Sequence, residues 1–166
     1  MPQPAYLYVN RGLTRNISIF VNTVWFLNHP QDFAVFTCPI GCPSDCCKFE
    51  GFEDMPVVLE DEVRILTQEA GRIGIKLRFE PYGEHNGVKL YKWVIEGWCP
   101  FFKGKCTIHE KKPLSCRMYP LVLNLKTGDI YLSEKCLWVR LNGPKPLDHF
   151  PAEKEALKKL VIKLRL

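Results

Sequence analysis

Apolar and polar residues alternate with a helical period in one central stretch of the chain. Over residues 57–72 the apolar side chains recur three or four positions apart, and one helix face would carry Val63, Leu66 and Ala70. The acidic residues at positions 60–62 would lie in the first turn, where the helix dipole favours negative charge. Gly71 and Gly74 can end the helix, because glycine accepts the backbone conformation of a helix C-terminus.

Strands are predicted where apolar and polar residues alternate over shorter stretches. Residues 75–79 and 88–96 show this alternation, and the turn-rich segment 81–87 separates them. Residues 121–125 and 129–133 show it again on the two sides of a Lys-Thr-Gly sequence, which predicts a hairpin.

A final helix is predicted from about Ala152. Its apolar residues alternate with basic ones, and residues 151–166 carry five bases and two acids. This pattern favours an amphipathic helix docked on the domain over a contact with a membrane or RNA. Together with the cysteine-bearing loops expected at 38–50 and 97–119, the pattern predicts an α+β fold.

Composition and charge narrow the class of protein. Of the 166 residues, 46% are hydrophobic and 25% are charged, which fits a globular chain and excludes a disordered one. The formal net charge of +5 suits an acidic partner such as nucleic acid, although many proteins without such a partner are equally basic. The N-terminus lacks the pattern of a signal peptide, and the apolar stretch 17–27 is too short to cross a bilayer. We therefore expect a cytoplasmic protein with no membrane span.

Clustered cysteines are the main chemical feature of the chain. Two loops and the segment after the predicted hairpin supply eight of them: Cys38, Cys42, Cys46, Cys47, Cys99, Cys106, Cys116 and Cys136. Disulfides would not persist in a reducing cytosol, and structural cysteines scatter over core positions instead of clustering. Thiolates are ligands of zinc and of iron–sulfur clusters, usually four to a centre, so all eight are candidate metal ligands.

The spacing of the cysteines leaves the number of centres open. Cys46 and Cys47 are neighbours whose side chains would point to opposite sides of an extended segment, which suits two centres better than one small ion. Eight donors would fill two four-coordinate sites, or one cluster with several thiols left over. The Cys-x2-Cys pairs of a zinc ribbon are absent. A 4Fe-4S cluster is therefore preferred to Zn²⁺ as the cofactor, and His109 could replace one thiolate.

A set of short motifs lies within residues 38–136. It comprises the paired cysteines of segment 42–47, the sequence Val-Leu-Glu-Asp-Glu at 58–62, Cys99-Pro100-Phe101, Cys106-Thr107-Ile108, and segment 112–120, which ends in Cys-Arg-Met-Tyr-Pro. This set resembles the YkgJ-like cysteine-cluster family, a zinc- or iron-chelating domain named for its CxxCxxCC motif. The first cysteine pair is one residue wider than in that motif, and Lys112 stands where the family usually has arginine. The resemblance implies metal binding, with Arg117 and Tyr119 orienting a bound group or donating hydrogen bonds to its sulfur atoms.

The predicted architecture is a small, irregular, cysteine-rich metal-binding domain with a few short strands, one central helix and a C-terminal helix. Residues 1–37 are predicted to form an N-terminal extension packed on this domain. The cysteine-cluster domain itself would span 38–139. Residues 140–166 would form a linker and a basic amphipathic helix.

The predicted function is that of a metal-binding protein acting as a binding or structural module in a larger assembly. The basic terminal segments could contact a protein or ribonucleoprotein partner. Neither a nucleophile–base arrangement nor a pair of catalytic carboxylates stands out, which favours a protein that is not an enzyme. The alternative is an iron–sulfur-dependent enzyme or enzyme component, in redox chemistry or protein lysine methylation, because flagellin lysine N-methylase has a similar cysteine cluster. A glycine-rich loop for a methyl donor does not accompany it.

Overall fold

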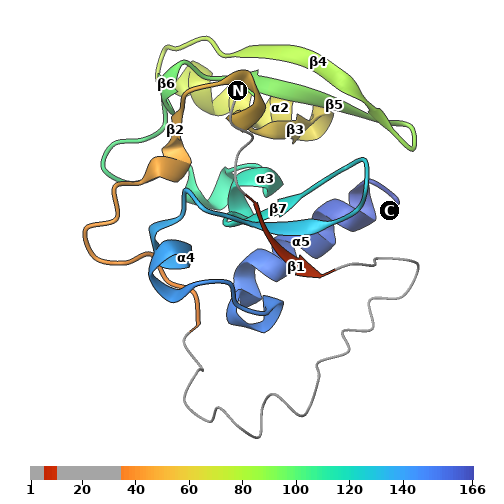
Figure 1. Cartoon of the computed structure of the whole chain (residues 1–166). Helices are drawn as coiled ribbons and strands as arrows, with labels where there is room; N and C mark the ends of the chain where they lie inside the picture. Colours follow the sequence, from red (N-terminus) through yellow and green to blue (C-terminus); the bar gives the residue numbers. More distant parts are fainter. Residues whose placement is uncertain (1–5, 11–34) are drawn as a thin grey trace, which may run out of the picture.

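The computed structural model describes residues 6–10 and 35–166, whose elements form two halves with the short helix α3 between them (Figure 1). In one half, α2 (Glu60–Arg72) packs against an antiparallel sheet of order β3-β5-β4. The strands are β3 (Val57–Leu59), β5 (Val88–Val94) and β4 (Arg78–His85). The core of this half is formed by apolar side chains of the helix, the sheet and the following loop: Val58, Leu66, Ala70, Trp93, Ile95, Phe101 and Ile108.

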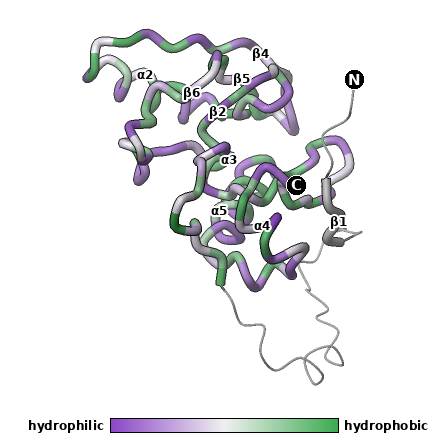
Figure 2. Tube along the Cα trace, turned by 60° about the vertical axis from the view of Figure 1, so that its left-hand side comes forward, coloured by the Kyte–Doolittle hydropathy of each residue, from purple (hydrophilic) through white to green (hydrophobic). Residues whose placement is uncertain are grey.

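The second half is built on another antiparallel sheet, of order β1-β8-β7. Its strands are β1 (Tyr6–Asn10), β8 (Ile130–Ser133) and β7 (Leu121–Leu123), and α5 (Pro151–Lys163) packs against β7 and α3. Buried side chains of this core come from the sheet, from α5 and from the chain between them, and they include Leu121, Leu132, Trp138, Phe150, Leu157 and Leu160. Figure 2 shows hydrophobic and hydrophilic residues interspersed along the elements of both halves, as expected where each element buries one face.

Short elements connect the two halves. η1 (Asp45–Cys47) leads into β2 (Lys48–Phe49), which pairs with β6 (Gly97–Trp98). η2 (Phe52–Asp54) precedes the first sheet, and η3 (His109–Lys111) precedes α3.

α3 itself covers Leu114–Arg117. After β8 the chain forms α4 (Leu137–Asn142) and η4 (Leu147–His149) before α5 begins. The part of the chain described by the structure contains no helix long and apolar enough to cross a membrane.

Several predictions are confirmed. The elements form a small α+β fold with antiparallel sheets. Residues 121–133 form a hairpin in which Leu121 lies opposite Leu132. The C-terminal helix docks on the domain through Ala156, Leu157, Leu160 and Leu164, which are all buried. Residues 1–5 and 11–34 of the predicted N-terminal extension lie outside the described residues, whereas β1 from the same extension pairs with β8.

Other element boundaries were predicted wrongly. The helix begins at Glu60 and not at residue 57, because 57–59 pair with β5 as a strand. The strand expected at 75–79 instead spans 78–85 and includes most of the segment interpreted as a turn. Its hairpin turns at Asn86 and Gly87, whose φ angles of 49° and 81° suit a two-residue loop. α4 was not predicted, since six residues are too few to show a helical period.

Candidate metal centre

Backbone hydrogen bonds join the first two cysteine-bearing segments. In the ladder between β2 and β6, Lys48 lies opposite Trp98. Next to this ladder, the Cys99 N–H donates a hydrogen bond of 2.7 Å to the carbonyl oxygen of Cys47. Cys46 and Cys47 therefore lie beside Cys99, although the two segments are far apart in the sequence.

The loop after Cys99 folds back and returns Cys106 to the same region. The Phe102 N–H donates to the Cys99 carbonyl over 2.9 Å, and Phe102 and Cys106 form an isolated antiparallel bridge. Gly104, between them, has a φ of 76°, a backbone conformation that favours glycine. Cys99 and Cys106 both pack against the core of the first half, which fixes the loop from that side.

Cys116 lies on α3, and a buried carboxylate fixes this short helix. Glu62 of α2 accepts a hydrogen bond of 2.7 Å from the Leu114 N–H at the start of α3. Its second oxygen accepts a bond of 2.9 Å from the Leu59 N–H at the start of its own helix. Burial raises the pKa of the Glu62 carboxyl, and the two hydrogen bonds act against that rise. Glu62 thereby clamps α3 to the first half of the fold.

Four thiols from these three segments lie close enough for their charges to interact: Cys46, Cys99, Cys106 and Cys116. Burial is the main cause that raises the pKa of the Cys99 thiol, to about 11, and it also raises the pKa of Cys116. The pKa of Cys46 is raised first by a hydrogen bond with the Cys47 thiol and then by burial. Without a bound cation the thiols of Cys46, Cys99 and Cys116 hold their protons at neutral pH.

Three further thiols form a second group. Cys136 is buried between β8 and α4, and Cys38 and Cys42 flank a turn in which the Cys42 N–H donates to the Pro39 carbonyl over 3.1 Å. Burial raises the pKa of Cys136, and the charges of Cys38 and Cys42 raise it further. Cys38 also interacts with Cys46, so the second group adjoins the first.

One lysine acts on both groups. The Lys112 ammonium lowers the pKa values of Cys38, Cys46 and Cys116, against the rise that burial and neighbouring thiols cause. A nearby positive charge stabilises the thiolate form of cysteine, which is the form that binds metal. In the sequence, Lys112 stood out only because the family usually has arginine at this position. Its approach to cysteines of the 38–50 loop and of α3 depends on tertiary structure.

Two buried hydroxyls in this region have no hydrogen-bond partner within the described residues, Ser115 Oγ and Tyr119 Oη. Ser115 directly precedes Cys116, and the charges of Cys136 and Cys46 act on the Tyr119 phenol. The neighbouring Ser133 hydroxyl lies close enough to act against the rise in the Tyr119 pKa, but it lies outside hydrogen-bond geometry. Burial raises the pKa of Tyr119, which therefore stays a hydrogen-bond donor at neutral pH. A metal–sulfur centre fits this arrangement of thiols and hydroxyls. Its thiolates or sulfides would accept hydrogen bonds from the two hydroxyls, which have no other acceptor within the described residues.

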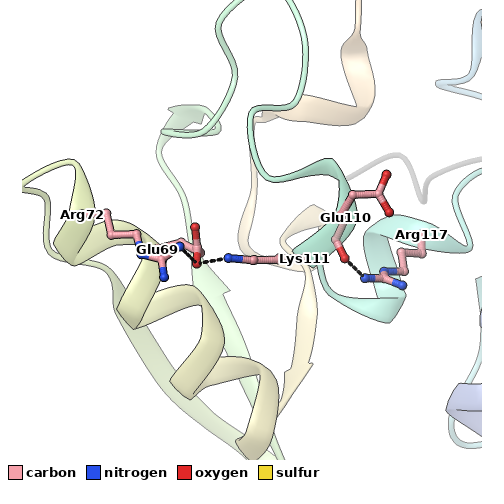
Figure 3. Close-up of polar contacts among 5 residues, drawn as sticks. All are labelled: Glu69, Arg72, Glu110, Lys111 and Arg117. Carbon is pink, nitrogen blue, oxygen red and sulfur yellow. Dashed lines mark hydrogen bonds and ion pairs between the residues drawn. The ribbon is translucent and has the colours of Figure 1, made fainter.

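Arg117 lies against the backbone of its own segment. Its Nε donates to the Lys112 carbonyl over 2.9 Å, and its Nη2 donates to the Glu110 carbonyl (Figure 3). On the other side, the Lys111 ammonium lies 2.7 Å from the Glu69 carboxylate of α2 (Figure 3). These contacts hold the η3–α3 segment in place, and the expected contact of Arg117 with a bound group stays a prediction.

All eight cysteines are free thiols. Within the described residues, no three His, Cys, Asp or Glu side chains converge at the spacing of metal ligands. His109, the candidate substitute ligand, is exposed on η3. The fold thus brings seven of the eight predicted ligands into two neighbouring groups, with Cys47 hydrogen-bonded to Cys46, without closing a coordination sphere around one point.

A comparison with protein families gives one match. The family model CxxCxxCC, described as "Putative zinc- or iron-chelating domain", matches residues 37–138, which include all eight cysteines and more than half of the chain. Neither the curated proteins nor the solved structures contain a match to this chain.

Proposed function

Because the chain belongs to the CxxCxxCC family of zinc- or iron-chelating domains, we propose that four of its thiols hold one metal centre. The four are Cys46, Cys99, Cys106 and Cys116. The observation that carries this proposal is how the three segments are placed: the Cys99 N–H donates to the carbonyl of Cys47, next to Cys46, and the Phe102–Cys106 bridge returns Cys106 to the same region. Cys116 lies near enough for the charges of the other three thiols to act on it. Four thiolates are the usual ligand set of a structural zinc ion and of an iron–sulfur cluster.

The proposed centre fastens the two halves of the fold to each other. Cys99 and Cys106 pack against the core of the first half. Cys116 comes from α3, whose first residue Leu114 belongs to the core of the second half together with Met118. A metal bound to these thiols would hold the surfaces of both halves in a fixed relation. A domain whose two halves are fixed by metal in this way would act as a binding module in a larger assembly. Its expected partner is a protein or a ribonucleoprotein.

An iron–sulfur cluster fits the site better than zinc on one observation. The hydroxyls of Ser115 and Tyr119 lack acceptors within the described residues, and a cluster offers sulfides as well as thiolates. When bound, such a cluster supplies a one-electron redox group. The iron–sulfur-dependent enzyme is therefore kept as the second candidate function, and it requires a visible absorption band that bleaches on reduction.

Metal affinity is expected to rise with pH. The pKa values of Cys46, Cys99 and Cys116 are raised, by a hydrogen bond and burial at Cys46 and mainly by burial at the other two, so a metal ion must displace protons from these ligands as it binds. Between about pH 6 and about pH 8, Zn²⁺ affinity should increase up to about tenfold per pH unit for each proton released. Competition titrations at several pH values measure the slope, and an indicator dye in weak buffer counts the protons. An affinity independent of pH, with no proton release, would contradict thiol ligation.

Tyr119→Phe is expected to change stability in opposite directions with and without metal. In the metal-free protein it removes a buried hydroxyl that lacks a partner, which should stabilise the fold by up to about 1 kcal/mol. In the loaded protein it removes a hydrogen bond to sulfur and should destabilise by about 1 kcal/mol. Denaturant unfolding of both forms measures this, with the exposed Tyr82→Phe as the control. The same sign in both forms would place Tyr119 outside the centre.

A further inference from the structure

We propose that the groove between α2, α5 and the η3–α3 segment docks an acidic, amphipathic segment of a partner protein. The groove has a volume of about 400 Å³, which is within the range of ligand-binding clefts. Its lining includes residues of all three elements and none of the cysteines. The proposed docking surface therefore contains none of the candidate ligands, although α3 and Lys112, whose charge acts on three of the thiols, contribute to both.

The groove presents apolar side chains from two helices. Ile65 of α2 and Ile162 of α5 line it, and 41% and 74% of their surfaces are exposed. Leu114, at the start of α3, is buried and belongs to the same lining. Covering large aliphatic side chains with a partner removes apolar surface from water and favours association. The two isoleucines thus define a position for an apolar side chain of the partner.

Basic residues surround this apolar strip: Lys111, Lys112, Arg117, Lys159 and Lys163. Lys163 pairs with Asp61, and Lys111 pairs with Glu69 (Figure 3). Lys112 and Lys159 make no ion pair within the described part of the chain. Both oxygens of Glu62 already accept backbone hydrogen bonds, so this carboxylate is not available to the two lysines. Charge complementarity therefore calls for carboxylates on the occupant.

Other occupants fit less well. The lining contains no aromatic side chain on which a nucleic-acid base could stack, and Asp61 and Glu110 interrupt the positive charge that a phosphate backbone would follow. The chain's own segment 11–34 contains Arg11 and Arg15 and only one acid, Asp32, so its charge is unsuitable. A protein segment with acidic residues around an apolar one matches both the isoleucines and the unpaired lysines.

Selection from a phage-displayed library of random peptides on the full chain tests the proposal. Enriched peptides should carry Asp or Glu on both sides of an aliphatic residue. Labelled copies should bind the wild-type chain saturably and more weakly as salt increases. Ile162→Glu should weaken this binding about tenfold, and Lys159→Glu should weaken it several-fold. Both residues are exposed, so these variants should keep the melting temperature of the wild type.

Lys158→Glu is the matched control, because Lys158 lies on the same helix, pairs with Glu155 and does not line the groove. It makes the same change of net charge and should leave peptide binding unchanged. Equal weakening by Lys158→Glu would overturn the proposal, since binding would then depend only on overall charge. No enrichment, enrichment without acidic residues, or tighter binding of poly(U) or anionic vesicles than of the selected peptides would also overturn it.

Discussion

Replacing Cys116 by serine is expected to lower the stability of the metal-loaded protein by several kcal/mol, up to the ~10 kcal/mol that structural zinc supplies in small metal-dependent domains. Cys116 is the thiol that α3 contributes to the proposed centre, and serine is a poor ligand for a soft metal site. Unfolding by denaturant, with and without a strong chelator, measures the effect. With chelator, the variant and the wild type should differ by no more than about 1 kcal/mol, because their apolar cores are the same.

Cys38→Ser is the control for this comparison. Cys38 is exposed and belongs to the second group of thiols, so its loss should leave the first centre filled and most of the metal-dependent stability in place. If Cys116→Ser keeps the full stabilisation by metal, Cys116 is not a ligand and the centre does not link the two halves.

Replacing Glu62 by alanine is expected to destabilise the protein by about 2–4 kcal/mol, even without metal. The carboxylate accepts hydrogen bonds from the Leu59 and Leu114 N–H groups at the starts of two helices, and alanine leaves both donors buried without a partner. α3 also loses its clamp to α2, so metal should dissociate faster from the loaded variant. Urea unfolding and the rate of metal transfer to a chelator measure the two effects.

Glu60→Ala provides the matched control, since Glu60 is an exposed acid in the first turn of the same helix. It should cost no more than about 0.5 kcal/mol. Glu62→Gln keeps one acceptor oxygen and should lie between wild type and Glu62→Ala. Equal effects of Glu60→Ala and Glu62→Ala would show that the helix dipole, and not the clamp, explains the role of Glu62.

The elements that could be predicted from the sequence are those with a long period or an unbroken alternation. The central helix, the 121–133 hairpin and the C-terminal helix are of this kind. β4 was interpreted partly as a turn because it contains Pro81 and Gly83. Its position at the edge of the sheet tolerates both residues, because an edge strand has one row of unpaired backbone groups. The Asn86-Gly87 pair was the signal that would have placed the turn correctly.

The candidate metal centre likewise has features that could be predicted from the sequence and features that could not. Residue type and clustering were enough to single out the thiols as candidate ligands, because few other chemistries need seven cysteines in two loops and an eighth after a hairpin. Their grouping could not be predicted, since it depends on tertiary contacts such as the bond from the Cys99 N–H to the Cys47 carbonyl. Glu62 was interpreted only as a first-turn acid, although it lies four positions before Leu66 on the buried face of α2. The approach of Lys112 to the thiols likewise depends on how α3 packs.

The most direct test of the central claim is the metal and acid-labile sulfide content of protein purified without oxygen, for the wild type and for four single variants. The variants replace each proposed ligand by serine: Cys46, Cys99, Cys106 and Cys116. We expect all four to lose the same metal, with matching sulfide if the centre is an iron–sulfur cluster and none if it is zinc. Cys38→Ser should retain that metal. Full metal content in any of the four variants, or a wild-type protein that binds neither zinc nor iron, would contradict a single centre held by these thiols.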